Sequence, residues 1–114
     1  FWEAINNQGL VLFEMGHIKK AIKTWRKVLK IKPDPEPMLA LAAALNKFSL
    51  NNSESLELAK KALSQNPNYV SPVHQKEQLW GKKLREATKA LLSSPKLENV
   101  LVRAKANSSA TMSN

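Results

Sequence analysis

Residues 18–33, with the sequence IKKAIKTWRKVLKIKP, are the stretch that decides the fold. Its apolar residues recur at the spacing of one face of an α-helix. They are Ile18, Ala21, Ile22, Trp25, Val28 and Leu29. Gly16 stands just before the stretch and Pro33 closes it, and both residue types favour the ends of helices. The sequence therefore predicts a helix between these two residues, with Trp25 in the core.

The residues before Gly16 predict a second helix that pairs with the first. Their apolar and small residues also fall at helical spacing. The stripe consists of Trp2, Ile5, Gly9 and Leu12. A glycine in the middle of such a stripe lets two helices approach closely. We therefore expect residues 2–32 to form a helical hairpin that is packed through this stripe.

The end of this hairpin recurs along the chain. Residues 25–33, WRKVLKIKP, align with residues 59–67, AKKALSQNP, at a spacing of 34 residues. Two helices, a closing proline and a period of this length indicate a stack of helical repeats. A single hairpin cannot bury both of its faces, so neighbouring hairpins form a shared core.

The first hairpin resembles the tetratricopeptide repeat family. Gly9 stands where that family has a small residue, Gly16 at its turn, Ala21 five residues later, Trp25 at a large aromatic position and Pro33 at the end. The resemblance implies an all-α, right-handed superhelix of two helical hairpins followed by capping helices. It also implies a non-catalytic scaffold for protein–protein interaction or assembly.

The organisation that we expect along the chain has four parts. The second repeat is irregular because its turn, residues 49–53, contains no glycine, and Ser53 is a candidate N-cap for the helix after it. Later helices start at Ser71-Pro72 and Ser94-Pro95, where serine caps and proline suits the first turn. The first of these runs for about 20 residues, with Gly81 as a weak point. The parts are a repeat at 1–33, an irregular repeat at 34–67, capping helices at 68–106 and a disordered tail at 107–114.

The stretch EQLWG at residues 77–81 is similar to the C-terminal segment of some repeat proteins of cyanobacteria and chloroplasts. Phe1 already stands in a helical pattern, so we expect the chain to be a processed form or a piece of a longer protein. With 43 % apolar and 24 % charged residues the composition is that of a soluble globular domain. The sequence does not assign a compartment beyond that resemblance.

A second row of residues lies on the first helix, beside the core stripe. Asn6, Leu10 and Phe13 fall at i, i+4 and i+7. In the tetratricopeptide family this row faces the concave groove, where partner peptides bind. We predict a contact surface there, completed by Glu14 and by Lys47 from the next repeat. Three alternatives remain for what covers this row. They are a partner peptide, the chain's own C-terminal segment, and an upstream repeat or second copy.

Some family members bind the C-terminal carboxylates of heat-shock chaperones through a clamp of lysine, arginine and asparagine. In the first repeat, Asn6 and Leu10 occupy the positions that would carry the clamp's lysine and asparagine. The resemblance therefore implies that this repeat lacks the chaperone clamp.

Positive charge is concentrated on the second helix. Residues 17–32 contain seven basic residues and no acidic one, in a chain of net charge +9. Lys19, Lys23, Arg26 and Lys30 fall on one helix face. This face is either an ordinary solvated surface or a site for an acidic partner. The alternative function is an electrostatic binder of anionic surfaces, either nucleic acid or acidic lipid. Nucleic acid is the weaker alternative because no aromatic residues alternate with the basic ones.

Signals of catalysis are weak, and we predict that the chain is not an enzyme and has no cofactor or metal. There are no cysteines, so thiol chemistry and thiolate metal sites are excluded. His17 and His74 are the only histidines, and their positions predict solvated residues rather than ligands. No phosphate-binding loop or nucleophile motif is present. Trp80 is predicted to anchor the capping helix.

Overall fold

The computed structural model describes residues 1–109. Within this range all regular structure is helical, which confirms the predicted all-α class. The α-helices are α1 (Trp2–Glu14), α2 (Ile18–Ile31), α3 (Pro35–Phe48), α4 (Ser53–Gln65), α5 (Pro72–Glu77), α6 (Lys82–Leu92) and α7 (Glu98–Asn107). Two short 3₁₀ turns, η1 (Pro67–Val70) and η2 (Pro95–Leu97), separate the later helices.

The first hairpin, α1 and α2, forms through one turn and one close approach. Gly16 has a φ of +87°, a left-handed conformation that favours glycine, and it ends α1 as predicted. Where the helices meet, a Cβ on Gly9 would lie 2.5 Å from Nε1 of Trp25. Trp25 has no exposed surface and its ring centroid lies 6.0 Å from that of Phe13. The small residue therefore makes room for a buried tryptophan.

The second hairpin, α3 and α4, is the centre of the molecule. Asp34 caps α3 by accepting a hydrogen bond from the backbone N–H of Glu36 at 3.0 Å. Residues 38–44 of α3 are all buried, because α3 packs against α2, α4 and α6. The next helix is capped by Asn52, whose side chain accepts from the N–H of Ser55 at 3.0 Å. The N-cap therefore lies one residue before Ser53, where the sequence predicts it.

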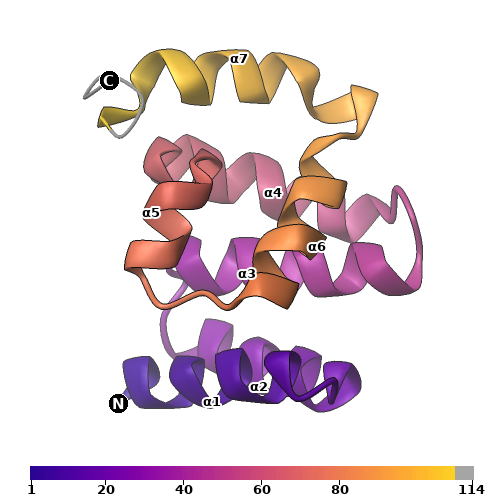
Figure 1. The fold of residues 1–114 in the computed structure, drawn as a ribbon, viewed down its shortest axis with the longest axis vertical. Helices are drawn as coiled ribbons and strands as arrows, with labels where there is room; N and C mark the ends of the chain where they lie inside the picture. The colour runs from indigo at the N-terminus through magenta and orange to yellow at the C-terminus, as the bar shows by residue number, and fades with distance from the viewer. Residues whose placement is uncertain (110–114) are drawn as a thin grey trace.

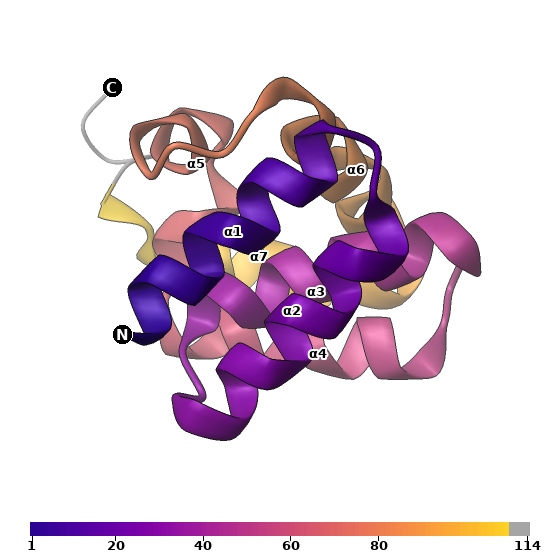
Figure 2. The same ribbon diagram turned by 90° about the horizontal axis from the view of Figure 1, so that it is seen from below.

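The C-terminal helices form two further layers (Figure 1). The helix predicted over about 20 residues after Ser71 is interrupted at residues 78–81, where Leu79 has a φ of +69°, and α5 and α6 run in different directions. Helix α6 packs on α3 and α1, whereas α7 packs on α4 and η1. Seen from below, α6 lies beside the C-terminal end of α1 (Figure 2).

The first three residues of the predicted disordered tail, 107–109, are ordered. Asn107 is the last residue of α7, Ser108 is buried, and the N–H of Ser109 donates to Oδ1 of Asn68 at 2.9 Å. These residues are ordered because Asn68 of η1 provides an acceptor for the end of the helix. The rest of the predicted tail, residues 110–114, lies outside the described range.

Candidate protein-binding surfaces

The predicted contact row on α1 is part of the core. Asn6, Leu10 and Phe13 are only 2 %, 6 % and 1 % exposed. The stripe predicted as core is less buried, since Trp2, Ile5 and Leu12 are all partly exposed. Gly9 of that stripe is nevertheless buried against Trp25, so both rows of α1 face the core. The second row is the more deeply buried because α6 also packs on α1. Of the three covers considered for the row, the structure shows the chain's own C-terminal segment.

Glu14, also placed in the predicted contact surface, binds the N-terminus of α6. Its carboxylate oxygens accept hydrogen bonds from the N–H groups of Lys83 at 3.0 Å and Leu84 at 2.9 Å. The first N–H groups of a helix lack partners within the helix, and the helix dipole favours an anion there. A Cβ on Gly81 would overlap the Glu14 carboxyl group, so a larger residue there would displace this carboxylate from its hydrogen bonds. Glu14 thus fixes α6 against α1.

Glu36 joins three parts of the chain, and no motif or spacing singles it out before the structure is known. Its carboxylate accepts from Nδ2 of Asn6 at 3.0 Å, from Nε1 of Trp80 at 3.1 Å and from the hydroxyl of Tyr69 at 3.3 Å. The three donors are nearly buried, with exposed fractions of 2–5 %. A buried polar group needs a partner, so this carboxylate holds α1, η1 and the anchor of α6 together. The predicted anchoring role of Trp80 fits these contacts.

His74 differs from its predicted place on the surface. Its side chain is 16 % exposed, and its ring packs edge-on against that of Tyr69 with centroids 4.6 Å apart. His17 is exposed, as predicted. Among residues 1–109, no three histidine or acidic side chains converge as metal ligands would. None of the helices in this part of the chain is both long and apolar enough to span a membrane.

The same surroundings shift the titration of the single tyrosine. Burial, and next the negative charge of Glu36, raise the pKa of Tyr69 above its ordinary value of about 10. We expect phenolate absorbance to appear at higher pH in the folded chain than in the chain unfolded by denaturant. The folded state holds the hydroxyl proton of Tyr69 more tightly than the unfolded state does. The contribution of this group to folding stability is therefore complete below pH ~10 and is lost as the pH rises further. An ultraviolet titration that gave the same midpoint in both states would contradict this environment.

The basic face of α2 is exposed, as its pattern predicts. Lys19, Lys23 and Lys30 are exposed and, within residues 1–109, make no ion pair. Arg26 differs, because its guanidinium binds the carboxylate of Glu54 on α4 through two bonds of 2.6 and 2.9 Å. This pair lowers the pKa of the Glu54 carboxyl. Three unopposed lysines therefore remain from the predicted set of four.

Lys47 is accessible but is separated from the row on α1. It lines a surface cavity of about 320 Å³ between the end of α3 and α6. The other lining residues are Asn46, Leu50, Lys83, Glu86, Ala87 and Ala90. The structure therefore does not combine Lys47 with Asn6, Leu10 and Phe13 in one open surface, because those three residues are buried.

The first hairpin is similar to a known protein family. Residues 2–35 match the tetratricopeptide repeat. This segment contains α1, the Gly16 turn and α2, and it is under a third of the chain. Tetratricopeptide repeats generally mediate protein–protein interactions and are typically non-catalytic scaffolds. Comparisons with curated proteins and with solved structures gave no match. The likeness of residues 77–81 to proteins of cyanobacteria and chloroplasts therefore stays a prediction.

Proposed function

We propose that this chain is a non-catalytic interaction module that binds an acidic protein partner. The match of residues 2–35 to the tetratricopeptide repeat carries the proposal, because such repeats generally mediate protein–protein interactions. In this proposal residues 34–67 act as an irregular second repeat and residues 68–106 as a cap. The family's usual contact row is filled by α6, so the partner contacts surfaces that remain accessible.

The accessible surface that best supports an acidic partner is the free lysine face, defined as Lys19, Lys23 and Lys30. Its three ammonium groups are exposed, and no carboxylate within residues 1–109 neutralises them. Unopposed charges of one sign on a protein of net charge +9 attract acidic surfaces and speed association with them. Lys47 is a further accessible cation of the predicted contact set.

The same lysines support a second candidate function, an electrostatic binder of nucleic acid or acidic lipid. Proteins that bind single-stranded nucleic acid usually stack bases on exposed aromatic rings. The one aromatic residue of α2 is Trp25, which is fully buried. The basic face of α2 therefore offers cations without a stacking surface, and a protein partner is the better-supported choice.

Charge reversal on the free lysine face tests the proposed function. We expect the variant Lys19→Glu, Lys23→Glu and Lys30→Glu to capture at least about tenfold less acidic protein from a nuclease-treated, membrane-free extract of the source organism. The matched control reverses three exposed lysines on other elements, Lys61→Glu, Lys76→Glu and Lys96→Glu, and has the same net charge. Quantitative mass spectrometry of the captured proteins provides the measurement.

Two outcomes would oppose this proposal. Equal loss in the two variants would mean that net charge, and not the free lysine face, determines capture. Capture of RNA or acidic vesicles would support the electrostatic binder instead, if no protein is retained once nucleic acid and membranes have been removed. A binder of that kind also weakens steeply with added salt.

A further inference from the structure

Helix α7 is attached to the second hairpin before its first residue and to η1 after its last. Before the helix, Oγ of Ser94 donates to Oδ1 of Asn51 in the α3–α4 turn at 2.8 Å. After it, the N–H and Oγ of Ser109 donate to Oδ1 of Asn68 at 2.9 and 3.0 Å. In the middle, the small residue Ala104 faces α4. The ends fix the position of α7, and a groove remains between α4 and α7.

The α4–α7 groove has a volume of about 410 Å³, within the range of roughly 300–1,000 Å³ that binding pockets occupy. Its apolar lining consists of Leu63 and Ala104, which are only 2 % and 3 % exposed, and of Pro67 and Val100, which are partly exposed. Four polar residues complete the lining. These are Lys60, Ser64, Arg103 and Asn107.

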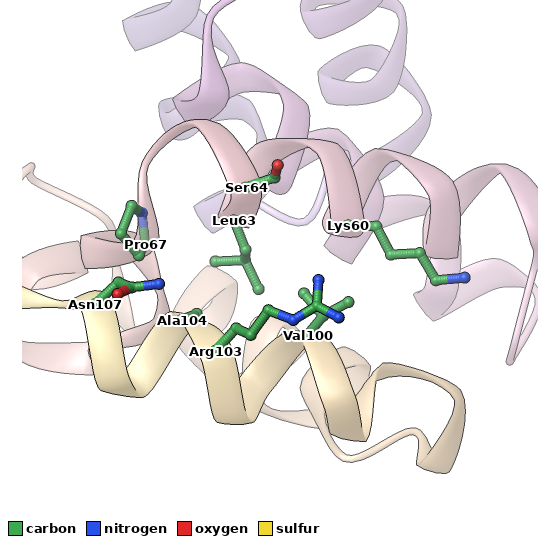
Figure 3. A pocket seen from close by; sticks show the side chains of 8 residues that line it. All are labelled: Lys60, Leu63, Ser64, Pro67, Val100, Arg103, Ala104 and Asn107. Atoms are coloured by element: carbon green, nitrogen blue, oxygen red, sulfur yellow. The ribbon is translucent and has the colours of Figure 1, made fainter.

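The charge of the α4–α7 groove has one sign. Its lining contains two cations, Lys60 and Arg103, and no carboxylate. Arg103 reaches from α7 toward α4, and Leu63 points from α4 into the same space (Figure 3). Within residues 1–109, Arg103 makes no ion pair or side-chain hydrogen bond. Lys60 forms an ion pair with Glu57 on its own helix, with 3.6 Å between the charged atoms. The side chain of Glu57 is itself 75 % exposed.

We propose that the α4–α7 groove binds a short acidic peptide segment, with a peptide carboxylate on Arg103 and Lys60 and an apolar side chain against Pro67 and Val100, which are partly exposed. A guanidinium offers paired donors that match a carboxylate. Ser64 and Asn107 supply further polar contacts for a peptide backbone. The absence of aromatic residues from this lining disfavours nucleic acid.

This inference rests on the proposed function and assigns a second contact to it. The groove lies between α4 and α7, away from the α1 row that resembles the family's concave surface. One acidic partner could therefore contact the free lysine face through its surface charge and the α4–α7 groove through an extended segment. Two linked contacts would raise the overall affinity above that of either one.

A labelled peptide of alternating glutamate and leucine tests the groove directly. In the full chain labelled with ¹⁵N, we expect its addition to shift the amide resonances of residues that line the groove. We expect Lys60→Gln with Arg103→Gln to weaken its affinity, measured by fluorescence anisotropy, by at least about tenfold. The matched control, Lys61→Gln with Lys105→Gln, removes two exposed cations of the same helices from outside the groove and should change affinity less than about threefold.

A third variant separates shape from charge. Ser64→Phe places a bulky group at the exposed edge of the groove without changing net charge, and it should also weaken binding. Melting curves confirm that each variant remains folded. A peptide with glutamine in place of glutamate should not bind.

Other outcomes would overturn the inference that the α4–α7 groove binds an acidic peptide. Equal weakening in the groove variant and its control, or resonance shifts confined to α2, would place binding elsewhere. Displacement of the peptide by RNA or phosphatidylserine vesicles at lower concentration than by unlabelled peptide would show a general anion site. If the chain captures acidic proteins but the groove variants capture them equally well, the groove inference fails and the proposed function stands. If no acidic protein is captured at all, the proposed function fails.

Discussion

Phe13→Ala is expected to lower the free energy of unfolding by about 3–5 kcal/mol, because it removes a large side chain from a packed core. Phe13 is 1 % exposed and contacts Trp25, and Leu10 beside it is 6 % exposed. A domain of this size is usually stable by only ~5–15 kcal/mol, so the variant should be close to the limit of folding. Urea unfolding followed by circular dichroism measures the change.

Val11→Ala is the matched control for this variant. Val11 lies on the same helix but is 57 % exposed, so its truncation should cost less than about 0.5 kcal/mol. If Phe13→Ala instead left stability unchanged, α6 would not cover the row in solution. The surface predicted from the sequence would then be open to a partner.

Glu36→Ala is expected to destabilise the chain by about 3 kcal/mol. Asn6, Tyr69 and Trp80 would lose a shared acceptor, and an unsatisfied buried donor costs about 1–3 kcal/mol. Water that enters the space left by the side chain offsets part of this loss. Glu36→Gln should have a smaller effect, because it keeps one oxygen acceptor but loses the charge.

The Trp80 indole provides a specific readout for Glu36. Loss of the 3.1 Å bond should move its Nε1–H proton resonance and speed its exchange with solvent. Glu57→Ala is the control, since Glu57 is 75 % exposed and, within residues 1–109, its side chain pairs with Lys60 alone. Its effect on stability should be within about 0.5 kcal/mol. A Glu36→Ala variant as stable as this control would mean that the three donors find other partners.

The position of α6 explains why the α1 row of Asn6, Leu10 and Phe13 is not accessible to a partner in this structure. Leu84 and Leu91 of α6 are fully buried, and Glu14 holds its first turn. Opening the row would expose both sides of this contact to water, which costs free energy in proportion to the apolar area. A partner is therefore better accommodated on surfaces that are already accessible.

Local features of this protein were readable from the sequence. The helix of residues 18–31 follows from its apolar period, and the turn follows from Gly16, which adopts a left-handed φ. The burial of Trp25 follows from the same period, whereas the close approach of its indole to Gly9 became visible only in the structure. The helix, the turn and the burial of Trp25 depend on residues close together in the chain, whose spacing leaves a visible pattern.

The tertiary structure alone decided that the second row of α1 is buried and which surfaces stay accessible. Both apolar rows of α1 satisfy the helical period, so the pattern cannot choose between them. The choice is made by contacts such as Glu14 with Leu84 and Glu36 with Trp80, which join residues 70 and 44 positions apart. Hydrogen bonds over such separations impose no periodicity on the sequence. The α4–α7 groove has the same origin, because it exists only where the two helices are held side by side.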